Sequence, residues 1–146
     1  LLHTTENPMT VDQSNHRFVH IQATNRGGAS DAYLFSTGTL QTDTTSRFFY
    51  PAVNWLRADD KGVFKKYPNH WHFSSTTVPC KTARFLTVMD THGDNRPDMQ
   101  VVRKGNTIQV GDWTITCNLT EKGKAAIYVI KREGEQQEKE WTRNYI

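Results

Sequence analysis

The segment MQVVRKGNTIQVGDWTITCNLTEKGKAAIYVIK, from Met99 to Lys131, decides the fold class. Short runs of Val, Ile, Thr and Trp, which suit a pleated and half-buried surface, alternate in it with glycine-containing breaks. Glycine supplies the positive φ that tight hairpins need. The segment therefore predicts an antiparallel meander. Its expected strands are Met99–Arg103, Thr107–Val110, Trp113–Cys117 and Ala125–Lys131, separated by Lys104-Gly105-Asn106, Gly111-Asp112 and Lys122-Gly123-Lys124.

Similar residues fill the rest of the chain. Thr is the commonest residue, with 19 copies, and the helix formers Leu and Ala are comparatively sparse. Residues 16–23 alternate, which places Phe18 and His20 on one face of a strand and Val19 and Ile21 on the other. Further strands are expected at Ala32–Thr37, Arg47–Tyr50, Val53–Arg57, His70–Thr77 and Ala83–Met89, the last two as a strand pair. This spacing predicts an all-β fold, an antiparallel β-sandwich rather than a barrel.

The length of 146 residues fits one domain. We expect a single β-sandwich domain over residues 1–132 and a polar C-terminal tail over residues 133–146, because Glu133–Arg143 has no apolar stripe. Ala58–Asn69 is charged and contains glycine, which indicates a long surface loop. The chain opens on Leu1-Leu2-His3, which reads as a strand already in progress. We therefore expect a domain cut from a longer polypeptide.

Composition excludes several classes of protein. With 36% hydrophobic residues the chain can form a packed core. No apolar run approaches the roughly 20 residues needed to span a membrane. The net charge of +3 is small and the basic residues are scattered, so no nucleic acid partner is expected. No phosphate-binding glycine loop or nucleophile motif occurs in the sequence, and no cofactor is expected.

The two cysteines, Cys80 and Cys117, leave two interpretations open. They can form one disulfide in an oxidising compartment, or be two small buried thiols. Asn118-Leu119-Thr120 is formally a glycosylation acceptor, which matters only in a eukaryotic secretory pathway.

Two motifs carry candidate chemistry. His70-Trp71-His72 places two imidazoles on one face of a strand, but no third metal ligand or orienting partner follows at a recognisable spacing. Asp90–Asp98 collects oxygen ligands that could bind Ca²⁺, yet the same residues are typical of a connecting loop. We therefore predict no catalytic residue and no metal ligand.

Aromatic and basic residues gather between positions 55 and 72. Exposed aromatic rings stack on sugar faces, and Arg and Lys pair with carboxylate or sulfate groups. The alternative is two core tryptophans beside a solvated basic loop. The candidate glycan-binding residues, called the aromatic–basic cluster below, are Trp55, Arg57, Lys65, Lys66, Tyr67, His70, Trp71 and His72.

The order of landmarks along the chain is also informative. These landmarks are Leu2-His3 before Asn7-Pro8, the Gly27-Gly28 turn before Ala32-Tyr33-Leu34, His70-Trp71-His72-Phe73, Ala83–Met89 and the closing meander. Their order resembles the carboxyl-terminal β-sandwich region of heparinase II/III-like polysaccharide lyases. The resemblance covers roughly Leu1 to Ile130.

The resemblance implies a parent enzyme that cleaves acidic polysaccharides by β-elimination, located in a bacterial periplasm or outside the cell. The family's catalytic and metal-binding motifs cannot be matched in this chain, so none of those residues is carried over. We expect a non-catalytic, mainly structural accessory domain, with the preceding domains of the parent enzyme and an acidic polysaccharide as partners. The alternatives are an independent carbohydrate-binding module, a structural interaction domain of a surface protein, and lyase activity in this chain through His70, His72 and Tyr67.

Overall fold

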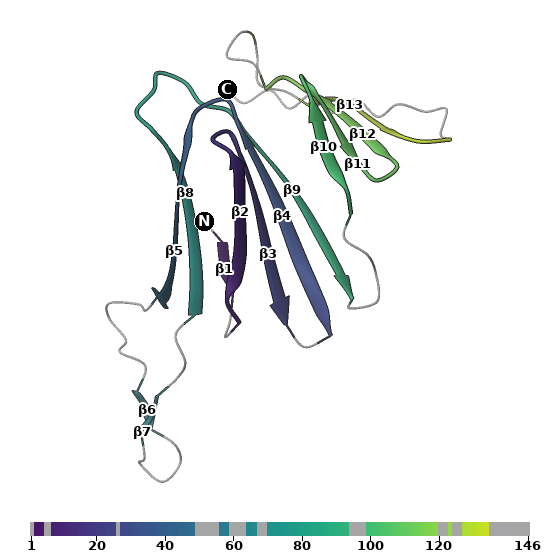
Figure 1. Cartoon of the computed structure of the whole chain (residues 1–146). Helices are drawn as coiled ribbons and strands as arrows, with labels where there is room; N and C mark the ends of the chain where they lie inside the picture. Colours follow the sequence, from purple (N-terminus) through teal and green to yellow (C-terminus); the bar gives the residue numbers. More distant parts are fainter. Residues whose placement is uncertain are drawn as a thin grey trace.

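The structure is a computed structural model that describes residues 2–4, 7–25, 27–48, 56–58, 64–66, 70–93, 99–119, 123 and 127–134 (Figure 1). Over these ranges the chain forms strands and turns but no helix. The strands are β1 (Leu2–Thr4), β2 (Met9–Asn15), β3 (Phe18–Asn25), β4 (Gly28–Ser36), β5 (Leu40–Phe48), β6 (Leu56–Ala58), β7 (Phe64–Lys66), β8 (His70–Thr77), β9 (Phe85–Gly93), β10 (Val101–Lys104), β11 (Thr107–Val110), β12 (Trp113–Cys117) and β13 (Ile127–Arg132).

These strands pair into antiparallel sheets. The central sheet has the order β2-β3-β4-β9, the β5/β8 sheet has the order β1-β8-β5, and the C-terminal sheet has the order β10-β11-β12-β13. Strands β6 and β7 form a separate two-stranded ribbon. The predicted all-β, antiparallel fold is confirmed, and Figure 1 shows the β5/β8 sheet and the C-terminal sheet on opposite sides of the central sheet.

Each face of the central sheet contributes to a hydrophobic core, so the sandwich has three layers. Val19 and Ile21 lie in a first core, together with Phe73 of the β5/β8 sheet. Tyr33 and Phe35 lie in a second core against residues of the C-terminal sheet. Because side chains alternate along a strand, β3 and β4 supply residues to both cores. The buried members are Met9, Val19, Ile21, Ala32, Leu40 and Phe73 in the first core, and Tyr33, Phe35, Ile108, Val110, Cys117 and Leu119 in the second.

The predicted meander is confirmed in the C-terminal sheet. Its strands follow one another in chain order, and two-residue turns join β10 to β11 and β11 to β12. Gly105 and Gly111 occupy the first central positions of these turns with φ of 61° and 54°. Glycine at that position is typical of the hairpin turn whose twist matches the flanking strands.

One predicted pairing is wrong. The strands predicted at His70–Thr77 and Ala83–Met89 lie in different sheets, because β8 pairs with β1 and β5 whereas β9 pairs with β4. Phe73 on β8 belongs to the first core, and Leu86 and Val88 on β9 pack against the second. The break around Pro79 therefore crosses between layers instead of closing a hairpin.

Two predicted loops are partly strands. Residues 90–93 of the expected Asp90–Asp98 loop continue β9, where Asp90 pairs with Asp31; residues 94–98 lie outside the described ranges. The expected loop Ala58–Asn69 contains the last residue of β6 and the whole of β7, and Ala58 stands opposite Phe64. Two further strands were missed, β2 and most of β5, because their polar sequences hide the alternation.

Other predictions can be checked only in part. The opening strand is confirmed as β1. Most of Val53–Arg57 and of residues 133–146 lies outside the described residues. No helix in the described part of the chain is long and apolar enough to cross a membrane.

The two cysteines form neither a disulfide nor a pair of buried thiols. Cys80 and Cys117 are free thiols. Cys117 is buried in the second core, and burial raises the pKa of its thiol, although the positive charge of Arg103 opposes this. Cys80 is exposed on the segment that crosses between layers.

Candidate functional site

The aromatic–basic cluster is divided among several parts of the structure. Trp55 and Tyr67 lie outside the described residues. Arg57 belongs to β6, and Lys65 and Lys66 belong to β7. The three remaining residues, His70, Trp71 and His72, open strand β8 in another sheet.

Within the β8 part of this cluster, Trp71 packs against the first core. Its position favours the core interpretation for this tryptophan. His72 is partly buried and stands opposite His3 of β1 in the register.

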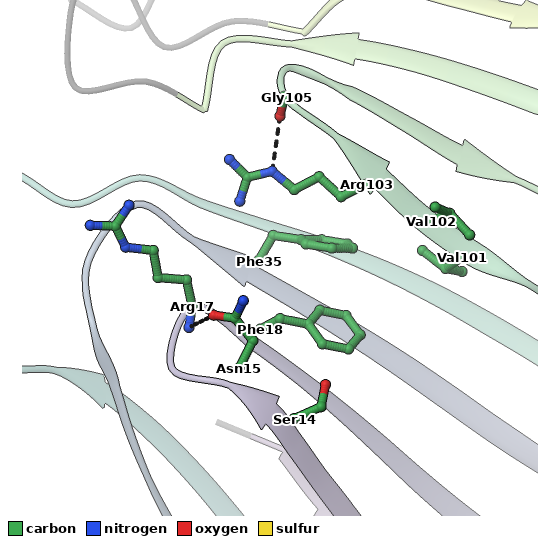
Figure 2. Close-up of a pocket in the computed structure, with 9 residues that line it drawn as sticks. All are labelled: Ser14, Asn15, Arg17, Phe18, Phe35, Val101, Val102, Arg103 and Gly105. Carbon is green, nitrogen blue, oxygen red and sulfur yellow. Dashed lines mark hydrogen bonds between the residues drawn. The ribbon is translucent and has the colours of Figure 1, made fainter.

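A groove with a cavity volume of about 480 Å³ lies where the turn between β2 and β3 approaches the hairpin of β10 and β11 (Figure 2). Polar residues come from the end of β2 and the turn after it, aromatic rings from β3 and β4, and a further arginine from β10. The lining residues are Ser14, Asn15, Arg17, Phe18, Phe35, Val101, Val102, Arg103 and Gly105.

Two phenylalanines give the groove an apolar part. The ring centroids of Phe18 and Phe35 are 4.9 Å apart and the rings are tilted by 37°. This geometry is favourable for an aromatic pair. Phe35 is buried and Phe18 partly buried, so both rings are held in place by the second core.

Two arginines bring positive charge to the same groove. Arg17 is exposed, and its backbone N–H donates to Asn15 Oδ1 over 2.8 Å, which holds the turn. Arg103 is partly buried, and its Nε donates to the Gly105 carbonyl over 2.9 Å. Figure 2 shows both guanidinium groups directed toward the same end of the groove, away from Val101 and Val102.

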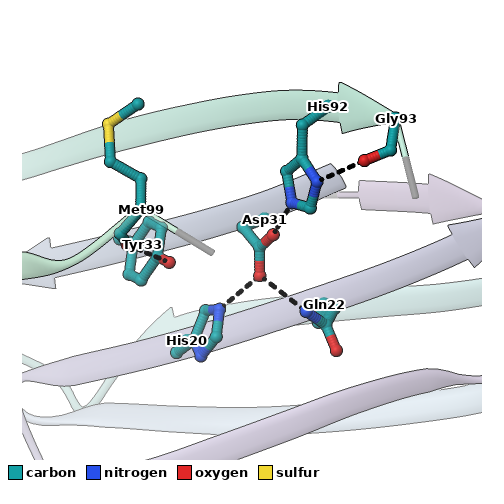
Figure 3. Close-up of polar contacts among 7 residues, drawn as sticks. All are labelled: His20, Gln22, Asp31, Tyr33, His92, Gly93 and Met99. Carbon is teal, nitrogen blue, oxygen red and sulfur yellow. Dashed lines mark hydrogen bonds and ion pairs between the residues drawn. The ribbon is translucent and has the colours of Figure 1, made fainter. Parts of the chain in front are cut away.

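A second constellation, the His–Asp–His cluster of His20, Asp31 and His92, lies on the central sheet (Figure 3). Asp31 is fully buried on β4. Its Oδ1 is 2.7 Å from His20 Nε2 on β3, and its Oδ2 is 3.0 Å from His92 Nε2 on β9. Gln22 Nε2 also donates to Oδ1 over 3.2 Å. The two strands that flank β4, β3 and β9, therefore direct ring and amide nitrogens at one carboxylate.

Burial and the neighbouring side chains act in opposite directions on the pKa of Asp31. Burial alone would raise the pKa of Asp31, but hydrogen bonds from His20 and His92, the positive charge of His20 and the hydrogen bond from Gln22 lower it below its ordinary value. His92 Nδ1 also faces an oxygen, the Gly93 carbonyl, at 3.2 Å. A neutral imidazole has one N–H, so both His92 contacts are hydrogen bonds only when the ring is protonated.

The packing around the His–Asp–His cluster favours a structural role. His92 is nearly buried, and the ring of His20 stacks on Tyr33 with 4.4 Å between centroids. The Tyr33 hydroxyl donates to the Met99 carbonyl over 3.0 Å. In the described part of the chain, no group of three or more His, Cys, Asp or Glu side chains is arranged to hold a metal ion.

Both constellations were missed in the sequence. Arg17 and Arg103 belong to different sheets, and the His–Asp–His residues belong to three strands. One available signal was Asp31, a charged residue directly before the apolar run Ala32–Phe35. A buried charge in such a position requires partners.

The fold and these contacts define the chain as an antiparallel all-β sandwich protein with an open, arginine-bearing groove. No family model matches the sequence, and no curated protein matches it either.

Proposed function

We propose that this chain is a non-catalytic accessory β-sandwich domain that contacts an acidic polysaccharide through the groove at Arg17 and Arg103. The observation that carries the proposal is the combination of two arginines and two aromatic rings in one open groove. Acidic polysaccharides present carboxylate or sulfate groups on rings that also have apolar faces. The groove offers partners for both features.

Each kind of side chain has a place in this binding mode. A guanidinium group can donate two parallel N–H bonds to a carboxylate or sulfate, which gives direction as well as charge. Phe18, which is only partly buried, offers apolar surface to a sugar ring and is supported from below by the buried Phe35. Ser14 and Asn15 offer hydroxyl and amide groups to the sugar hydroxyls. A site open to solvent suits a polymer that continues beyond it.

The parent protein is, in this proposal, a heparinase II/III-like polysaccharide lyase secreted to a bacterial periplasm or exterior. The order of landmarks from Leu2-His3 to the closing meander supports it. The preceding domains of that enzyme are then the partners of this chain. The His–Asp–His cluster fits a structural role, because its carboxylate is fully buried and contacts three side-chain nitrogens.

Affinity electrophoresis tests the groove. The chain is run through gels with heparin, chondroitin sulfate, alginate or a neutral glucan, at low and moderate salt. We expect at least one acidic glycan to retard it in a way that survives added salt, because shaped contacts are screened less than net charge. The neutral glucan should have no effect.

Two double variants with the same loss of positive charge locate the contact. Arg17→Ala with Arg103→Ala should abolish the retardation, whereas Arg57→Ala with Lys65→Ala should preserve it. Equally weakened retardation in both variants would show that the glycan responds only to the net charge of the chain. Loss in the second variant alone would assign binding to the aromatic–basic cluster, and no retardation of the unmodified chain would refute glycan contact.

The alternatives predict different results. An independent carbohydrate-binding module would bind glycan without any contact to a lyase. Lyase activity in the chain itself would generate unsaturated uronate, which absorbs in the ultraviolet, when the chain is incubated with an acidic glycan. Formation of that chromophore would refute the non-catalytic assignment.

A further inference from the structure

Strand β9 borders the central sheet. In the order β2-β3-β4-β9 it pairs with β4 on one side, and no described strand pairs with its other side. The ladder with β4 runs from Phe85 opposite Ser36 to Gly93 opposite Gly28 without a register shift. This edge is therefore long and regular.

The backbone groups of β9 divide between its two sides. The N–H of Thr37 donates to the Arg84 carbonyl over 3.0 Å, which makes these two residues a hydrogen-bonded pair. Because hydrogen-bonded pairs alternate along an antiparallel ladder, the even-numbered residues of β9 direct their backbone groups at β4. Phe85, Thr87, Met89 and Thr91 direct theirs to the outer edge.

The same odd-numbered residues expose apolar side chains. Phe85 is 51% exposed and Met89 is 60% exposed, and Thr87 between them is exposed as well. Leu86 and Val88 pack against the second core, so the odd-numbered side chains lie on the opposite face of the strand. Backbone donors, acceptors and apolar side chains thus meet along one edge.

This edge lacks the features that keep sheet edges from pairing. Proteins protect exposed edges with Pro, Lys, inward-pointing charges or bulges. The sequence FLTVMDTHG contains neither Pro nor Lys, and its only acidic residue, Asp90, is buried on the other face. A second copy of the strand would therefore meet no like charge on the outward-facing residues.

We propose that β9 pairs antiparallel with β9 of a second copy of this chain, about a two-fold axis at Thr87. In this register Thr87 stands opposite its own copy, and Phe85 of each chain stands opposite Met89 of the other. The contact between Phe85 and Met89 then forms twice, once on each side of the two-fold axis, as an isologous interface requires. The two central sheets become one continuous sheet, the association mode known as β-strand addition.

The oligomeric state and a cysteine pair test this register. Sedimentation velocity over a wide concentration range should show a monomer–dimer equilibrium. In a Cys80→Ser background, Thr87→Cys should form a disulfide dimer on mild oxidation, because opposite residues of a hydrogen-bonded pair lie about 5.5 Å apart between Cα atoms. Thr91→Cys is the matched control and should stay monomeric on a reducing-agent-free gel, since it stands opposite residue 83 instead of its own copy.

A charge placed at the edge tests the apolar contact. Met89→Lys should shift the chain to the monomer, and Val102→Lys, at an exposed apolar residue of another sheet, should leave the dimer intact. Circular dichroism confirms that both variants keep their β-structure. A monomer at every concentration, a dimer that survives Met89→Lys, or cross-linking through Thr91→Cys would each overturn the proposal.

Discussion

Asp31 is a charge that the interior tolerates only because of its neighbours. It lies fully buried between two histidines and a glutamine, on the sheet that supplies apolar residues to both cores. Removing a charge from water costs several kcal/mol unless partners replace the lost hydration. The identity of this one carboxylate therefore matters to the whole central sheet.

Asp31→Asn should destabilise the protein strongly. The amide keeps the size of the side chain but removes the charge that His20 and His92 surround. We expect the free energy of unfolding to fall by about 3 kcal/mol at neutral pH, the scale measured when one partner of a buried pair is removed. Urea denaturation measures the change. Asp12→Asn, at an exposed site on β2, should stay within about 0.5 kcal/mol of the unmodified chain.

Acid should weaken the same contact. The pKa of Asp31 in the folded protein is lower than its ordinary value of 3.8, so the contribution of the carboxylate to stability is fully present above pH 3.8. It is lost as the pH falls through the lower, folded-state pKa. Unfolding curves between about pH 5 and pH 2 should therefore show a slope that Asp31→Asn reduces. An identical slope in both proteins would contradict this assignment.

At the residue scale, the sequence predicts which face of a strand a side chain lies on better than it predicts which side chains of other strands it contacts. The alternation of Val19 and Ile21 with Phe18 and His20 is confirmed, because it depends only on neighbouring positions in one strand. The partners of Asp31 come from two other strands, β3 and β9, and the spacing of residues along the chain does not indicate which strands are adjacent in the sheet. The same holds for Arg17 and Arg103, which meet only through the stacking of two sheets.

At the scale of elements, β4 and β9 leave little space for a side chain at Gly28. A Cβ on Gly28 would lie 2.9 Å from the His92 carbonyl oxygen, whereas a Cβ on Gly93, the residue opposite, would meet the Gly27 carbonyl at 3.7 Å. Gly28→Ala should therefore force the strands apart and cost about 1–3 kcal/mol, as overpacking does. Thermal unfolding should show a clear loss for Gly28→Ala and little for Gly93→Ala. Equal losses of stability in the two variants would mean that the loss of glycine flexibility, and not the contact with the His92 carbonyl, causes the destabilisation.

Turns and pairings differ in how well the sequence predicts them. The C-terminal meander follows from local signals, because glycines at positions 105 and 111 close hairpins between neighbouring strands. The predicted pairing of the strands now seen as β8 and β9 was wrong, because the chain changes layers between them. Polar strands such as β2 escaped prediction since their structure comes from pairing with β3.

At the scale of the whole molecule, the central sheet joins two cores. Ala32 on β4 faces the first core and Tyr33 faces the second. Arg84, directly before β9, also reaches the C-terminal segment, because its guanidinium donates to the carbonyls of Asn118 and Gly123. A sheet shared in this way should make the two outer sheets unfold as one unit, although each has its own core.

Ile108→Ala tests this cooperativity. Ile108 is fully buried in the second core, and truncating a buried isoleucine costs about 2–5 kcal/mol through lost burial and the cavity left behind. If the central sheet couples the cores, hydrogen exchange should accelerate by the same factor in β8 of the first core as in β11 of the second. Val102→Ala, on the exposed side of the C-terminal sheet, should change neither rate. Faster exchange confined to the C-terminal sheet would show instead that the third layer unfolds independently of the sandwich beneath it.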